Sequence, residues 1–213
     1  TRYPLVTGVQ TCALPIFEAR NLNRGISTAP PQVIPKGFVV VDTETTGLHD
    51  PARVIEIALV FMSPLGKIEG AWTTLVRGDG SAGGPRLERI HGIRDADLRH
   101  APTFATLAPK ILNALDGRVV FAHNAAFDRS RLNYEFSLLR RRNLPAFGCT
   151  MHLGNQMGHG ILKLADAVSR FGISHEIAHA ALPDAVATAE LLRHYMRSNR
   201  DGFRNYLTKK GFI

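Results

Sequence analysis

The sequence predicts an α/β protein built on one mixed β-sheet with helices packed on it. Two observations predict this class: three strand-like runs follow one another early in the chain, and helical and strand-like patterns then alternate. Strands joined by short turns pair antiparallel, whereas strands separated by a helix usually pair in parallel. We therefore expect the first three strands to be antiparallel and the sheet to continue in parallel.

The first three strands are expected at residues 38–45, 53–62 and 67–77. The first run, FVVVDTET, is apolar and β-branched until it turns polar at its end, which is typical of a buried central strand. The second and third runs are joined by SPLG, whose proline and glycine are typical of a tight turn. These two runs should form an antiparallel hairpin beside the first strand.

The rest of the body combines helices with one further strand. Apolar residues recur at helical spacing in four stretches, and the apolar run GRVVFAH between the first two is typical of a buried strand. Thr103 is suited to cap the first of these helices, and Pro183 stands near the start of the last. The helices are expected at residues 103–115, 124–143, 163–173 and 182–196, and the strand at residues 117–123.

The two ends of the chain are expected to lie outside the domain, which we place at residues 38–198. Residues 1–37 are expected to form an N-terminal tail. Its first part, residues 1–16, contains VTGVQTCALPI, which resembles the translation of a common sequencing-library adapter and is left out of functional reasoning. Residues 17–37 contain a Pro-Pro pair and are typical of a linker. Residues 199–213 are expected to form a C-terminal tail.

Charge and cysteine content limit the classes of function. The net charge of +8 favours a negatively charged partner, nucleic acid first. No run approaches the roughly 18 consecutive apolar residues that a membrane helix requires, so no membrane association is expected. Cys12 and Cys149 have neither the spacing of a metal site nor that of a disulfide framework. A reducing, cytoplasmic setting is therefore the expectation.

Four acids and one histidine stand where a fold can bring them together. Asp42 and Glu44 are two residues apart on the first strand, so both side chains point to the same face. Asp128 starts the helix after the last predicted strand, and Asp184 starts the last helix, with His179 five residues before it. Each has an ordinary alternative: a polar strand end, a helix-start acid that suits the helix dipole, or a surface loop histidine.

Taken together, the four acids favour a metal site. Carboxylates held close to one another repel and raise one another's pKa, and divalent cations remove this conflict. Ligand sets made of oxygen atoms suit Mg²⁺ or Mn²⁺ rather than zinc. Two such ions can activate a water and stabilise the leaving oxygen of a phosphodiester, and a histidine is suited to take the proton of that water.

Three motifs then resemble those of one family. DTETTGL, HNAAFD and HAALPD resemble, in order, the motifs of the DEDDh exonucleases, the group that contains the epsilon proofreading subunit of bacterial DNA polymerase III. The segments ERIHGIRDADLRHAPTF and DAVATAELL are also similar to family sequences, and the resemblance extends over residues 37–197. The DEDDy subgroup has a tyrosine four residues before the last acid, where this chain has Ala180, so the resemblance is to the histidine subtype.

The resemblance implies a ribonuclease H-like fold, two bound divalent ions (Mg²⁺ or Mn²⁺) and a role for each acid. It implies removal of nucleoside 5′-monophosphates from the 3′ end of a single strand. Asp42 would bridge both ions, and Glu44 and Asp184 would complete the shell of the catalytic ion. Asp128 would hold the second ion, partly through water, and His179 would be the general base.

The resemblance also implies residues that contact the terminal nucleotide. Leu48 would wedge against its base, while plain core packing is the alternative for Leu48 and Phe127, and a structural loop role is the alternative for His91. The implied substrate-binding residues are Thr45, Leu48, His91, Asn124 and Phe127.

Three functions remain open at the level of sequence. The first is a 3′-to-5′ exonuclease on single-stranded DNA, with proofreading beside a DNA polymerase subunit as one role. The second is an enzyme that trims RNA or short oligonucleotides by the same chemistry. The third is a catalytically silent nucleic-acid-binding module, which should lack at least one of the four acids or the histidine, whereas all five are present.

Overall fold

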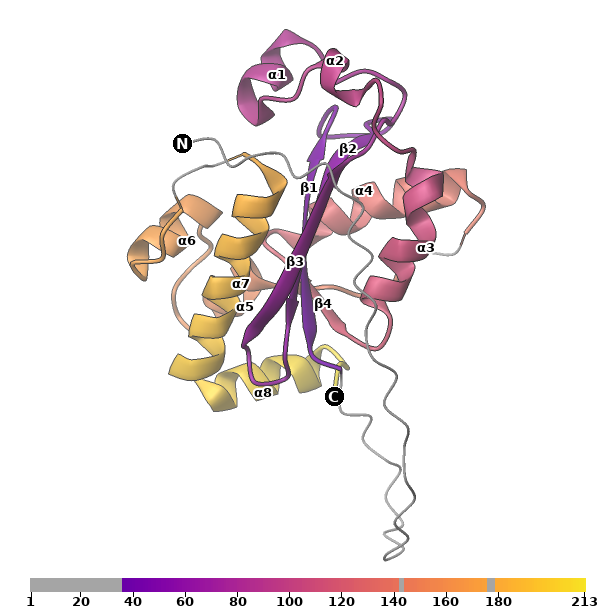
Figure 1. Cartoon of the computed structure of the whole chain (residues 1–213). Helices are drawn as coiled ribbons and strands as arrows, with labels where there is room; N and C mark the ends of the chain where they lie inside the picture. The colour runs from indigo at the N-terminus through magenta and orange to yellow at the C-terminus, as the bar shows by residue number, and fades with distance from the viewer. Residues whose placement is uncertain (1–35, 142–143, 176–178) are drawn as a thin grey trace, which may run out of the picture. The chain divides into compact units, whose positions relative to one another are not determined.

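The computed structural model describes residues 36–141, 144–175 and 179–213, which belong to one compact unit, Gln32–Ile213 (Figure 1). Residues 1–35, which hold almost all of the expected N-terminal tail, lie outside the described residues. Among the helices that the structure describes, none is long and apolar enough to cross a membrane.

Five strands form one mixed sheet in the order β3-β2-β1-β4-β5, and the first four run in the directions that the sequence predicted (Figure 1). The pairs β1–β2 and β2–β3 are antiparallel, whereas β1–β4 and β4–β5 are parallel. The strands are β1 (Phe38–Thr45), β2 (Val54–Met62), β3 (Ile68–Leu75), β4 (Val119–Ala122) and β5 (Gly148–Cys149).

The four predicted helices are confirmed, with shifts at their ends. Thr103 caps α3, since its hydroxyl accepts a hydrogen bond from the backbone N–H of Thr106. Helix α4 ends five residues before the expected boundary, and the chain then adopts a left-handed φ of 55° at Arg140. The helices are α1 (Pro85–His91), α2 (Asp95–Leu98), α3 (Phe104–Leu115), α4 (Ala125–Leu138), α5 (Thr150–Gln156), α6 (Leu164–Arg170), α7 (Ala181–Ser198) and α8 (Arg200–Lys209).

The sheet separates two hydrophobic cores because side chains alternate along its strands. Along β1, Phe38 and Val40 face a cluster that includes side chains of α7 and α8. Val39 and Val41 face the other cluster, to which α3 and α4 contribute. Figure 1 shows α7 on one side of the sheet and α3 with α4 on the other. Asp42 and Glu44 alternate in step with Phe38 and Val40, so their side chains point to the α7 side of the sheet.

The C-terminal segment is part of the core and not the expected tail. Residues Arg200–Lys209 form α8, and its Phe203, Tyr206 and Leu207 are buried. These residues are three and four apart, so they share one face of the helix. The ring of Phe203 lies 5.7 Å from that of Phe38, centroid to centroid. Helix α8 thus closes the sheet at the end where β1 begins.

Candidate active site

The site lies at the C-terminal end of β1, where the predicted acids come together. Asp42 and Glu44 are on β1, and Asp184 lies in the first turn of α7, which packs across β1 and β2. Carboxylate oxygens of these three residues all lie within 4.8 Å of one another. The predicted convergence of Asp42, Glu44 and Asp184 is therefore present in the fold.

Asp128 reaches the site from the opposite side of the sheet. Strands β1 and β4 are parallel, so helix α4, which follows β4, begins beside the C-terminal end of β1. The Asp128 carboxylate is buried and accepts a hydrogen bond of 2.8 Å from the hydroxyl of Thr43. Its charge is close enough to Asp42 to raise the pKa of that residue. Asp128 therefore lies beside the three-acid cluster.

Burial, with mutual repulsion at Asp42 and Glu44, makes Asp42, Glu44 and Asp128 reluctant to ionise without a cation. Burial raises the pKa of Asp42 well above its ordinary value, and the charges of Asp128 and Asp184 add to this. Burial and the charge of Glu56 raise the pKa of Glu44 from 4.5 to about 8. Burial also raises the pKa of Asp128 to about 7, against the opposing hydrogen bond from Thr43. Oxygen donors at this spacing, with ionisation suppressed, fit a site for divalent cations.

A fifth acid, Glu56, borders the site and was missed by the sequence reasoning. It lies on β2 directly across from Glu44. One carboxylate oxygen accepts a 3.1 Å hydrogen bond from the backbone N–H of Ala181, at the start of α7. Burial raises its pKa. A charged residue inside the apolar run VIEIALVFM was the signal that could have identified it.

Two histidines contact Asp184, and only one of them, His179, was predicted from the sequence as a site residue. His179 is exposed, and its backbone N–H, rather than its ring, contacts the Asp184 carboxylate at 3.2 Å. The imidazole of His175 lies against the other oxygen of Asp184, at 2.5 Å. Residues 176–178 between them lie outside the described part of the chain. In this conformation His175, and not His179, presents its ring to the acids.

The five implied nucleotide contacts fall into three groups. Leu48 is 69% exposed and Asn124 is exposed beside the site at the start of α4, so core packing does not account for Leu48. Phe127 is half-buried and Thr45 is buried, with its hydroxyl bonded to the carbonyl of Gly47.

His91 forms the third group, because both nitrogens of its ring make hydrogen-bond contacts with the backbone. Nδ1 accepts a hydrogen bond from the backbone N–H of Ile93, and Nε2 lies 3.2 Å from the carbonyl of Ala82. Its ring is buried and ties the segment before α1, at Ala82, to the segment after it, at Ile93. The structural alternative for His91 therefore agrees with its contacts.

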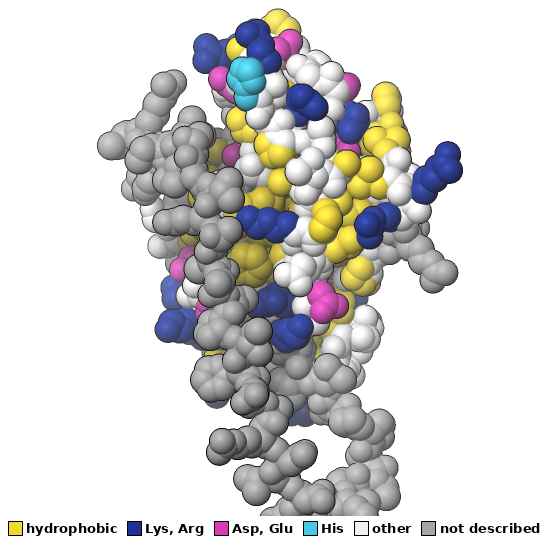
Figure 2. All heavy atoms as spheres, turned by 45° about the vertical axis from the view of Figure 1, so that its right-hand side comes forward, with side chains coloured by type: hydrophobic (Ala, Val, Ile, Leu, Met, Phe, Trp, Pro, Cys, Tyr) yellow, Lys and Arg dark blue, Asp and Glu magenta, His cyan; other side chains and the backbone are white. Residues whose placement is uncertain are grey.

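Positive charge is spread over the surface rather than gathered at one point on the face that Figure 2 shows. Lys and Arg side chains are scattered there, with hydrophobic side chains gathered between them. Scattered positive charge can attract a polyanion nonspecifically. Specific binding must come from the acidic site and the groups around it.

Comparisons with known proteins agree with the geometry of the site. A family model described as "Exonuclease" matches residues 39–192. The DNA polymerase III subunit epsilon of Treponema pallidum (strain Nichols) is 31% identical over 172 residues, covering 76% of this chain and 79% of that protein. The subunit epsilon of Escherichia coli (strain K12) is 31% identical over 168 residues, covering 72% and 68%.

Solved structures are similar as well. Exonuclease X in complex with 5′ overhanging duplex DNA has a TM-score of 0.61 at 29% identity, covering 76% of this chain and 93% of that chain. Escherichia coli Exonuclease I in complex with a dA16 oligonucleotide has a TM-score of 0.71 at 17% identity, covering 80% and 42%, which shows a shared fold.

Proposed function

This chain belongs to the exonuclease family, and on that premise we propose that it is a metal-dependent 3′-to-5′ exonuclease that releases nucleoside 5′-monophosphates from single-stranded DNA. The observation that carries the proposal is the cluster of Asp42, Glu44 and Asp184, whose carboxylate oxygens lie within 4.8 Å of one another. A fourth acid, Asp128, lies beside this cluster and raises the pKa of Asp42.

The donor set fits two divalent ions, Mg²⁺ or Mn²⁺. In our proposal Asp42, Glu44 and Asp184 hold one ion, and Asp42 with Asp128 holds the other. Ions held in this way activate water and stabilise negative charge on a phosphodiester. The Thr43 hydroxyl bonds to one oxygen of Asp128, which fixes the orientation of that carboxylate.

We assign proton transfer to His179, whose backbone N–H contacts the Asp184 carboxylate. A neutral imidazole can take the proton of the attacking water and is suited to do so near neutral pH. The backbone of His179 is already tied to Asp184, so a turn of its ring toward the acids would bring the base to the reacting water. His175 already contacts Asp184 through its ring and provides a natural comparison.

The choice of DNA rests on what the similar proteins are named for and were solved with. Two relatives are named as subunits of a DNA polymerase, and Exonuclease X was solved with duplex DNA that carries an overhang. We propose proofreading beside a polymerase subunit as one role of the chain. Leu48, four residues after Glu44, and Asn124, at the start of α4, have exposed side chains, and in our proposal they contact the terminal nucleotide.

The test is a direct assay of end specificity and substrate. Single-stranded DNA and RNA of the same sequence, labelled at either end, would be incubated with the protein and Mg²⁺ or Mn²⁺. We expect mononucleotides from the 3′ end of DNA, no product in EDTA, and none from the Asp42→Ala variant. Preferred cleavage of RNA would replace the substrate in the proposal by RNA. Binding without cleavage under every condition would instead support a silent binding module.

A further inference from the structure

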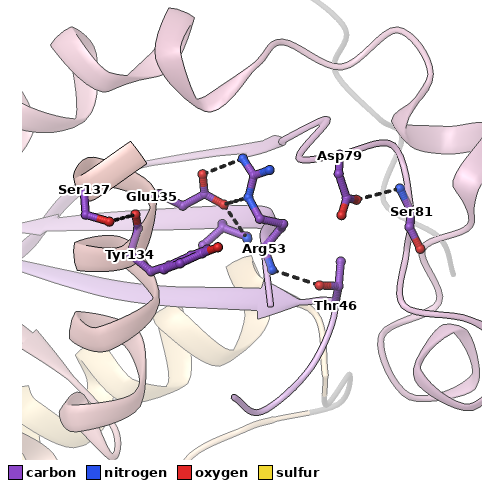
Figure 3. Close-up of polar contacts among 8 residues, drawn as sticks. Thr46, Arg53, Asp79, Ser81, Tyr134, Glu135 and Ser137 are labelled. Atoms are coloured by element: carbon purple, nitrogen blue, oxygen red, sulfur yellow. Dashed lines mark hydrogen bonds and ion pairs between the residues drawn. The ribbon is translucent and has the colours of Figure 1, made fainter. Parts of the chain in front are cut away.

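Residues 46–53 form the loop between β1 and β2. Its two ends, Thr46 and Arg53, are bonded to each other and form the neck of the loop, and the neck is bonded to α4. The backbone N–H of Thr46 donates to the carbonyl of Arg53, and the N–H of Arg53 donates to the Thr46 hydroxyl, at 2.9 and 2.8 Å. The Arg53 guanidinium then donates to both carboxylate oxygens of Glu135 on α4, at 2.8 and 2.9 Å (Figure 3). Glu135 also accepts from the N–H of Val54 and is 1% exposed.

The same loop is tied to α4 a second time, near its tip. Arg131 precedes Glu135 by one helical turn, so the two side chains share a face of α4. Its Nη2 lies 2.7 Å from the carboxylate of Asp50. The Arg131 side chain is 7% exposed, whereas Asp50 is 62% exposed. Leu48, which is exposed and follows Glu44 by four residues in the chain, lies in sequence between the neck and the tip, so its loop is held on both sides of it.

Stability alone does not account for an arginine at position 131. Among the described residues, its Nη1 is buried without a hydrogen-bond partner, and its guanidinium lies 5.9 Å from the ring centroid of Phe127. Burying a charge with an unmet donor is costly, and an apolar side chain of similar length would avoid that cost. What an apolar side chain could not do is hold Asp50.

We propose that Arg131 is a positioning residue that sets, through Asp50, the loop that presents Leu48 to the terminal base of the substrate. The inference rests on the proposed function and deepens it, because it concerns how the same site binds the 3′ end of the nucleic-acid substrate. Helix α4 also carries Asp128, one turn before Arg131. One helix therefore fixes both an acid of the catalytic cluster and the loop that meets the base.

This arrangement predicts a separation of kinetic effects. Loss of the Arg131–Asp50 pair frees the loop but leaves Asp128, with its bond from Thr43, in place. Binding of the terminal nucleotide should weaken while the chemical step stays nearly unchanged. The effect should also depend on the terminal base, because Leu48 is apolar and can contact only the base or sugar, not the charge of the phosphate.

The experiment compares Arg131→Met, Asp50→Asn and the double variant with wild type. Arg193→Met is the matched control, since Arg193 pairs with Glu190 on the same helix, α7, away from this loop. We expect KM for single-stranded DNA to rise about threefold to tenfold in all three variants, the scale for losing an ion pair with one buried partner. The value of kcat should stay within about twofold of wild type, and the double variant should be no worse than either single one.

A second substrate isolates the base contact. With an abasic 3′-terminal nucleotide, wild type should lose efficiency relative to the normal end, whereas Arg131→Met and Leu48→Ala should lose less. Arg131→Lys, which keeps the charge, should recover part of the wild-type KM. A fall in kcat with unchanged KM, or additive single variants, would overturn the positioning role.

Amide hydrogen exchange provides a readout that does not depend on activity. Exchange at residues 47–52 should be faster in Arg131→Met and Asp50→Asn, and unchanged in Arg193→Met. If the wild-type protein released no nucleotides, the proposed function would fail, whatever the exchange data showed. If it were active while exchange and KM were the same in wild type and Arg131→Met, only the present inference would fail.

Discussion

Replacing Glu44 by glutamine should stabilise the metal-free protein and weaken the metal-loaded one. Glu44 has its pKa raised from 4.5 to about 8 by burial and by the charges of Glu56, Asp184 and Asp128. Its folded pKa lies above its unfolded pKa, so the native state holds the proton more tightly. Stability is therefore highest at low pH and is lost as the pH rises from about 4.5 through about 8.

The size of the effect follows from the shift. A change from 4.5 to about 8 corresponds to a ceiling of about 5 kcal/mol, at about 1.4 kcal/mol per pH unit. Solvent contact and sharing of charge among the acids reduce this to about 1–3 kcal/mol. For a chain of this length the melting temperature of Glu44→Gln at pH 9 in EDTA should exceed that of wild type by about 3–10 °C.

Calorimetric melting between pH 5 and pH 9, with EDTA or with MgCl₂, provides the assay. In EDTA the advantage of Glu44→Gln should grow with pH, whereas in Mg²⁺ wild type should gain more, by about 3 kcal/mol at a hundredfold excess over Kd. Glu69→Gln, an exposed position on β3, is the matched control and should change neither curve. Equal or lower stability of Glu44→Gln at pH 9 in EDTA would refute the reasoning.

Four further changes test the remaining parts of the account. Asp42→Ala should abolish nucleotide release yet keep or raise the melting temperature in EDTA, because one repelling acid is removed; turnover like that of wild type would remove this residue from the site. His179→Ala should lower kcat by about two to four powers of ten, and a larger loss in His175→Ala would make His175 the base. Glu135→Ala should cost about 3–5 kcal/mol in the free energy of unfolding, measured by urea titration, because Arg53 loses its buried partner; a loss below about 1 kcal/mol would contradict this. Deleting residues 1–16 should leave kcat/KM unchanged, and lost activity would show that the adapter-like stretch belongs to the enzyme.

The central part of the fold could be predicted because its sequence signals are local. The run FVVVDTET indicates both a buried strand and its polar end, and residues 38–45 form β1, as predicted. Helix α7 was predicted from apolar spacing and Pro183, and it begins one residue before the expected start. Since the acids stand at the ends of these elements, the topology alone was enough to bring three of them together.

Elements that depend on tertiary packing were not predicted. Strand β5 has two residues and no periodicity, and its pairing with β4 brings Gly148 against the ring of Phe121, where a Cβ would be 2.5 Å from a ring carbon. Helix α8 starts with the polar sequence RDG, and its apolar face is recognisable only once Phe203 and Tyr206 are seen in the core.

Prediction of the site from the sequence was limited in the same way, because some of its contacts depend on the tertiary fold. Glu56 and His175 act through contacts with Ala181 and Asp184, which are 125 and 9 residues away in the chain, respectively. Motif spacing identified His179, but the orientation of its ring depends on the loop conformation, which spacing does not determine. Residues recognised by motif could therefore be named from the sequence, whereas residues that orient them required the fold.

Diffraction from crystals soaked in Mn²⁺ would test the central claim most directly, because manganese is located by its anomalous signal. The account predicts two ions about 4 Å apart, bordered by Asp42, Glu44, Asp128 and Asp184. Crystals that take up no manganese at these carboxylates, or that bind it only at other residues, would contradict the account.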